Sequence, residues 1–100
     1  MSVYLMLTTL TDAGRKALQE DPEILKEINK ETEYMGVKIL TQYALLGQYD
    51  FVNIVEAPNN EAAAKLAIRL SAKGTTQTLT LAAISIDDLI ATLQERDKPW

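Results

Sequence analysis

The chain has 100 residues, of which 47% are apolar and 24% charged, and its formal net charge is −4 with an isoelectric point near 4.7. This acidic balance argues against nucleic acid as a partner, because binding to a phosphate backbone depends on clustered Lys and Arg. The sequence contains no cysteine and no histidine, which excludes disulfides, thiolate metal sites, cysteine nucleophiles and Ser-His-Asp catalysis. We therefore expect no metal and no cofactor.

The hydropathy of the chain predicts no membrane contact. No window approaches the ~20 consecutive apolar residues of a membrane span, and the start, MSVYLMLTTL, lacks the basic segment and long apolar core of a signal peptide. We expect a cytoplasmic protein with one domain over residues 1–100.

The N-terminal third predicts a strand followed by helical structure. Residues 3–10, VYLMLTTL, are short, apolar and partly β-branched or aromatic, which is typical of a strand. Apolar residues at helical spacing over residues 12–35 predict one helix with a break or two helices in tandem. Asp12 is a candidate N-cap, and Asp21, which precedes Pro22, is a better one.

The middle of the chain predicts a hairpin. Residues 37–46 and 50–57 alternate as strands do, and only the corner Gly47-Gln48-Tyr49 separates them. Asn59 and Asn60 then offer a cap for a helix that ends near Gly74.

The remaining residues predict a fourth strand over residues 75–84 and a short last helix that begins after Ser85. The order is thus β-α-β-β-α-β plus a terminal helix. Two right-handed crossovers joined by a hairpin give a four-stranded antiparallel sheet with both main helices on one face, which is the ferredoxin-like α+β arrangement.

The uncovered face of this sheet predicts a homodimer. Strand alternation allows Val3, Leu5 and Leu7 to face the helices and leaves Tyr4 and Met6 on the open side, where a second copy of the sheet would cover them. Higher oligomers stay open. The polar residues predicted for that face either line a small cavity or pair with one another or with water, and they are Thr8, Gln42, Asn53, Thr78 and Thr80.

The hairpin and the segments after it resemble a known family. GQYDFVNIVEAP, NNEAAAKLAIRLSAKG and TTQTLTLAAIS are similar to the GYD domain family, small proteins named for a Gly-Tyr-Asp signature and usually left without an assigned function. Gly47, Tyr49 and Asp50 occupy the motif, with Gln48 inserted. The resemblance implies a dimeric α/β-barrel of ferredoxin-like subunits. The hairpin is also similar to effector-binding domains of leucine-responsive regulators, which bind amino acids at subunit interfaces.

Two interpretations of the motif stay open. In the structural one, Gly47 adopts positive φ, Asp50 accepts backbone N–H bonds, and the ring of Tyr49 packs at a dimer seam. In the functional one, Tyr49 and Asp50 contact a ligand or transfer a proton.

Two functions follow from these patterns. One is a homodimeric small-molecule-binding or assembly module. The other is a cofactor-free enzyme, similar to small monooxygenases or isomerases, with a pocket inside the barrel. No catalytic spacing is visible, so we expect binding rather than catalysis. The candidate ligand-binding residues are Gly47, Tyr49, Asp50, Tyr4 and Asn53.

Overall fold

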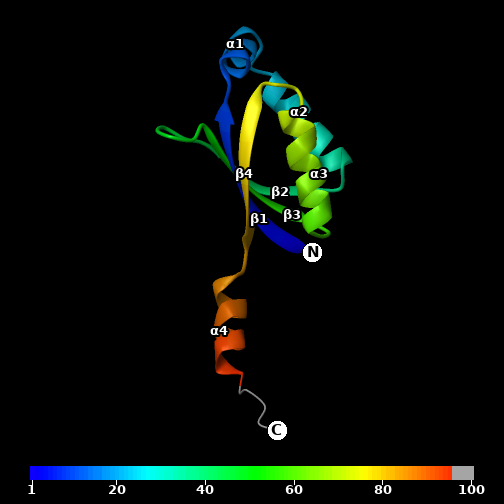
Figure 1. Cartoon of the computed structure of the whole chain (residues 1–100), viewed down its shortest axis with the longest axis vertical. Helices are drawn as coiled ribbons and strands as arrows, with labels where there is room; N and C mark the ends of the chain where they lie inside the picture. Colours follow the sequence, from blue (N-terminus) through cyan, green and yellow to red (C-terminus); the bar gives the residue numbers. More distant parts are fainter. Residues whose placement is uncertain (96–100) are drawn as a thin grey trace.

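A computed structural model describes residues 1–95 of the chain, so Trp100, a candidate for docking on a partner, lies outside the described residues. The elements follow the order β-α-α-β-β-α-β-α (Figure 1). They are β1 (Ser2–Leu10), α1 (Asp12–Glu20), α2 (Ile24–Tyr34), β2 (Lys38–Ala44), β3 (Phe51–Ala57), α3 (Asn60–Ser71), β4 (Thr76–Ala83) and α4 (Ile86–Gln94).

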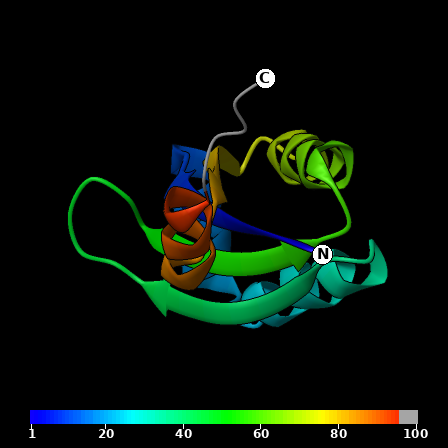
Figure 2. The same ribbon diagram turned by 90° about the horizontal axis from the view of Figure 1, so that it is seen from below.

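The four strands form one antiparallel sheet in the order β2-β3-β1-β4. Helices α2 and α3 lie against one face, and α1 lies beyond the end of β1 (Figure 1). This arrangement confirms the predicted ferredoxin-like α+β fold. The loop between β2 and β3 projects from one side of the sheet, as Figure 2 shows from below. No helix among residues 1–95 is long and apolar enough to cross a membrane.

The two faces of the sheet are assigned opposite to the sequence prediction. Tyr4 and Met6 are buried under the helices, with Val55 beside them and Leu66 of α3 above. Val3, Leu5 and Leu7 are on the open face and only half-buried. The prediction was wrong because both sets of side chains are largely apolar, so alternation separates two faces without saying which one the helices cover.

The predicted helical region over residues 12–35 is two helices in tandem. Asp21 leaves the helical conformation with φ −144° and ψ 87°, as expected of a residue that precedes proline. The predicted N-caps were displaced. Thr11, not Asp12, caps α1 by accepting the Gly14 N–H at 3.1 Å, and Asp21 accepts the Glu23 N–H at 3.2 Å in the turn before α2.

The C-terminal helix α4 lies apart from the rest of the described chain. Ser85 caps it by accepting the Asp88 N–H at 3.1 Å, as predicted. Its apolar side chains recur at spacings of three, four and seven residues, which forms one stripe along the helix. All four are exposed, and they are Ile86, Leu89, Ile90 and Leu93. Figure 1 shows α4 beyond the end of β4, away from α2 and α3.

Gly14 allows α1 to approach the start of β4 closely. A Cβ at this position would overlap the Thr75 carbonyl oxygen, which also accepts the Thr11 N–H at 3.0 Å. We predict that Gly14→Ala lowers the free energy of unfolding by about 2 kcal/mol, since the clash is with backbone and cannot be relieved by a rotamer change. Urea denaturation followed by circular dichroism measures this loss.

Gly36→Ala serves as the control for that prediction. Gly36 has φ +83°, and a methyl group added there would meet no other atom within 4 Å, so alanine costs about 1 kcal/mol from backbone strain alone. A neutral or stabilising Gly14→Ala, as the higher helix propensity of alanine alone would produce, contradicts the steric account.

Candidate functional site

A cavity of about 240 Å³ lies between the sheet and helices α2 and α3. Strands β1, β3 and β4 supply its floor through Thr8, Phe51 and Thr78, which are neighbours because Thr8 is opposite both of the others in the sheet register. The remaining lining residues are Leu10, Leu25, Ile28, Asn29, Gln42, Ala44, Asn53, Leu70, Lys73, Thr75 and Thr76.

A chain of three hydrogen-bonded side-chain amides forms part of the cavity lining. Asn29 of α2 and Gln42 of β2 exchange two hydrogen bonds, with Asn29 Nδ2 donating to Gln42 Oε1 at 2.9 Å and Gln42 Nε2 donating to Asn29 Oδ1 at 3.0 Å. Gln42 Nε2 also donates to Asn53 Oδ1 of β3 at 2.7 Å. These bonds tie α2 to the sheet.

Lys73, which follows α3, supplies the charged group of the cavity lining. Its Nζ lies 2.8 Å from Glu31 Oε2 of α2, so the ion pair joins the two helices that cover the cavity. The other Glu31 oxygen, Oε1, is buried and has no hydrogen-bond partner among the described residues. Glu31 is not part of the lining, so Lys73 is the charged residue that lines the cavity, with its ammonium paired to Glu31.

The chemistry of this lining favours binding over catalysis. No carboxylate, tyrosine or serine lines the cavity, so it offers amides, hydroxyls and one ammonium but no general base with a paired nucleophile. Among residues 1–95 no cluster of three acidic side chains is arranged to hold a metal ion. The cavity can therefore hold and orient a small molecule, but its own side chains supply little reactivity.

The sequence-predicted candidates do not gather at one place. Asn53 lines the cavity. Tyr4 is buried in the apolar core, where its hydroxyl donates to Asn60 Oδ1 at the start of α3. Tyr49 is half-buried in the β2–β3 loop, and Gly47 is exposed in the same loop. The polar residues predicted to share one face of the sheet mostly lie together. Four of them line the cavity, although on the helix side of the sheet, and they are Thr8, Gln42, Asn53 and Thr78.

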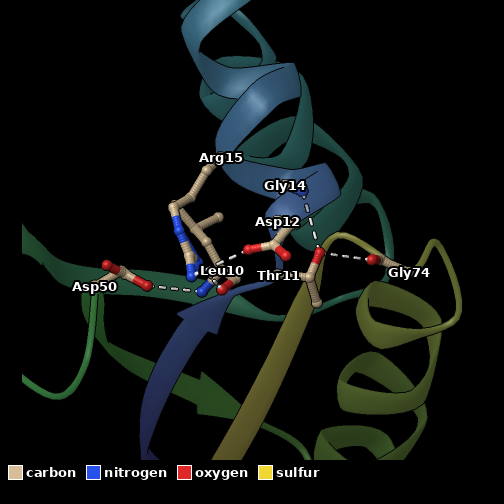
Figure 3. A network of polar contacts seen from close by, with 7 residues as sticks. All are labelled: Leu10, Thr11, Asp12, Gly14, Arg15, Asp50 and Gly74. Carbon is tan, nitrogen blue, oxygen red and sulfur yellow. Dashed lines mark hydrogen bonds and ion pairs between the residues drawn. The ribbon is translucent and has the colours of Figure 1, made fainter.

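Asp50 of the Gly-x-Tyr-Asp motif connects the hairpin to β1. Its N–H donates to the Thr8 carbonyl at 2.8 Å, and its Oδ2 accepts the Leu10 N–H at 2.7 Å. The Leu10 carbonyl accepts from Arg15 Nη1 at 2.6 Å. Figure 3 shows the Asp50 carboxylate and the Arg15 guanidinium converging on the backbone of Leu10.

These contacts have a simple physical cause. The pairing of β3 with β1 ends where Phe51 meets Thr8, so Leu10 extends past β3 with a backbone N–H and C=O that have no strand partner on that side. Two charged side chains replace the missing strand. Gly47 meanwhile has φ +120°, a conformation that favours glycine. The contacts of Asp50 and the backbone of Gly47 thus agree with the structural interpretation of the motif.

Sequence reasoning missed the helix-side half of the cavity. Asn29, Lys73, Leu25, Ile28 and Leu70 line it but were not among the candidates. One signal was available. Asn29 lies four residues after Leu25 and next to Ile28, so it is a polar residue beside the apolar stripe of a predicted helix. The contact between Lys73 and Glu31, 42 residues apart, has no signal in the sequence.

The fold and its cavity define a small α+β protein of the ferredoxin-like class with a site suited to binding. Residues 4–93 match the family model of the GYD domain. The chain is also 45% identical, over 95 residues, to the "Glutamine synthetase and cystathionine beta-lyase binding protein" of Thermus thermophilus, and the match covers 94% of this chain and 100% of the relative. No solved structure matches the chain. The protein belongs to the GYD domain family, which confirms the resemblance seen in the sequence.

The role of Asp50 can be tested by stability. We predict that Asp50→Ala lowers the free energy of unfolding by about 1.5 kcal/mol, because the Leu10 N–H loses a charged acceptor. Asp50→Asn, which keeps an acceptor oxygen, costs less. Tyr49→Phe changes stability by less than about 0.5 kcal/mol, since the Tyr49 hydroxyl makes no hydrogen bond among the described residues. Chemical denaturation gives all three values, and equal losses for Asp50→Ala and Tyr49→Phe would contradict the assignment.

Proposed function

We propose that this protein is a homodimeric binding module that attaches to enzymes of amino-acid metabolism and does not itself catalyse a reaction. The relative from Thermus thermophilus is matched by this chain over the relative's whole length, and it is named for binding glutamine synthetase and cystathionine beta-lyase. The alternative of a cofactor-free enzyme has less support, since Tyr49 and Asp50 are outside the lining of the cavity. Asp50 borders a more open pocket beside Arg15, but its carboxylate there accepts from the Leu10 N–H.

The observation that carries the proposal is the apolar open face of the sheet. Leu5 and Leu81 are opposite each other on adjacent strands, as are Leu7 and Leu79. Both residues of β4 are exposed, Leu81 by 43% and Leu79 by 45%. The other apolar residues of this face are Val3, Tyr43, Val52, Ile54 and Ala83. An apolar patch over four strands is typical of a contact surface, and a second copy of the same sheet would match it in size and polarity.

Helix α4 supports binding to another protein. Its stripe of exposed apolar residues packs against no other element of the described chain to any substantial extent. An amphipathic helix that projects in this way is suited to docking in an apolar groove, with anchor residues at spacings of three and four. We assign the open face to the homodimer and α4 to the enzyme partner.

The homodimer can be tested by charge on the open face. We predict that Leu81→Lys weakens dimerisation at least about 100-fold, because each interface would then bury two unpaired ammonium groups. Sedimentation equilibrium measures the dissociation constant. Ile68→Lys is the matched control, since Ile68 is 68% exposed on α3 and away from this face. A monomeric wild-type chain, or equal effects of the two variants, would refute the assignment.

The enzyme partner can be tested with purified proteins. We predict that glutamine synthetase or cystathionine β-lyase from the host organism binds the immobilised chain, and that Leu89→Lys on the α4 stripe weakens binding at least about tenfold by removing an anchor. Ala91→Lys, exposed on the opposite side of α4, is the control and leaves binding unchanged. Surface plasmon resonance gives both affinities. If neither enzyme binds the wild type, the proposal fails.

Binding of a small molecule is a second proposed function. The partly open space of about 240 Å³ between α2, α3 and the sheet supports it, since ligand sites are typically concave, mostly apolar and marked by a few convergent polar groups. This proposal does not depend on dimerisation, because one subunit supplies the whole lining.

A further inference from the structure

We propose that the cavity binds a small organic carboxylate with a branched apolar body. This inference rests on the proposed small-molecule binding and is independent of the proposed enzyme partner. It follows from which hydrogen-bonding atoms of the lining are already used, which remain free, and what surrounds them.

Each side-chain amide oxygen of the lining already accepts one hydrogen bond. Asn29 Oδ1 and Asn53 Oδ1 each accept from Gln42 Nε2, and Gln42 Oε1 accepts from Asn29 Nδ2. No Asp or Glu lines the cavity. A ligand that enters with hydrogen-bond donors therefore finds no carboxylate, and every side-chain amide oxygen that it meets already accepts one hydrogen bond.

Donors, in contrast, remain free. Asn53 Nδ2 carries two N–H groups that make no hydrogen bond among the described residues, because only Oδ1 of this side chain is engaged. Lys73 carries three N–H groups and makes one hydrogen bond, to Glu31. The hydroxyls of Thr8 and Thr78 also make no hydrogen bond within the described part of the chain and donate equally well. Free donors and a positive charge select a ligand that accepts hydrogen bonds, and a carboxylate is the strongest such acceptor.

The apolar part of the lining determines the size and apolar character of the ligand beyond its carboxylate. Leu25 and Ile28 of α2 and Leu70 near the end of α3 cover the floor formed by Thr8 and Phe51. The volume of about 240 Å³ equals that of roughly eight water molecules at about 30 Å³ each. A branched acid such as 4-methylpentanoate, with eight non-hydrogen atoms, is of this size. Its carboxylate would meet Asn53 and Lys73, and its branched end would meet Leu25 and Ile28.

The test compares two nearly isosteric probes on the full-length protein. 4-Methylpentanoate and its amide, 4-methylpentanamide, are titrated separately into ¹⁵N-labelled protein, and the backbone amide shifts are followed by NMR. We expect saturable shifts at the lining residues with the acid, and binding of the amide at least about tenfold weaker, because it loses the charge-assisted bonds.

Asn53→Asp sharpens the test without changing the size of the side chain. The aspartate still accepts from Gln42 but replaces the free Nδ2 donors with a carboxylate oxygen. We expect the affinity of this variant for the acid to fall at least about tenfold, so that it binds the amide better than the acid. Simple destabilisation does not produce such an inversion of preference. Gln48→Glu, with the same change of charge at an exposed position of the β2–β3 loop outside the cavity lining, is the control and keeps the preference for the acid.

The outcomes separate the ligand class from the site. Equal affinity for acid and amide, or an Asn53→Asp variant that binds the acid as the wild type does, overturns the carboxylate while leaving small-molecule binding in place. Shifts outside the lining residues overturn the site. No saturable shift with either probe up to solubility overturns both this inference and the proposed small-molecule binding, whereas the enzyme-binding proposal is judged by its own experiment.

Discussion

The rest of the structure depends on the position of β1 at the centre of the sheet. This strand pairs with β3 on one side and β4 on the other, so its alternation sets the alternation of both neighbours. Met6 is opposite Asn53 and Thr80, and all three side chains are on the helix side. Leu5 is opposite Ile54 and Leu81, and these are on the open side. One register thus divides the sheet into a covered face and an open face.

The covered face changes in character along β1. At the N-terminal end, Tyr4 and Met6 pack with Val55, Ala63 and Leu66 in a closed apolar core. Towards the C-terminal end the floor becomes Thr8 and Thr78, and a cavity lies above them, bordered by Leu25, Ile28 and Leu70. The outcome is a cavity next to a closely packed core.

The hairpin motif and the proposed binding surfaces have separate tasks. Gly47 permits the loop conformation, and Asp50 completes the hydrogen bonding of β1 where β3 ends. These contacts hold the end of the sheet at which Phe51 and Leu10 border the cavity. These contacts agree with the structural interpretation of the Gly-x-Tyr-Asp signature, and the proposed binding surfaces are the cavity, the open face and α4.

The sequence by itself determined the order of the elements, the ferredoxin-like topology and the family, because period-two and helical spacings, Pro22, Ser85 and the glycines are local signals. It also identified Asn53 and its polar neighbours as one group. Only the tertiary structure decided which face α2 and α3 cover, since Val3 and Leu5 are as apolar as Tyr4 and Met6. The pairing of Lys73 with Glu31 was likewise decided by the fold, because contacts between helices distant in sequence arise from packing rather than from spacing along the chain.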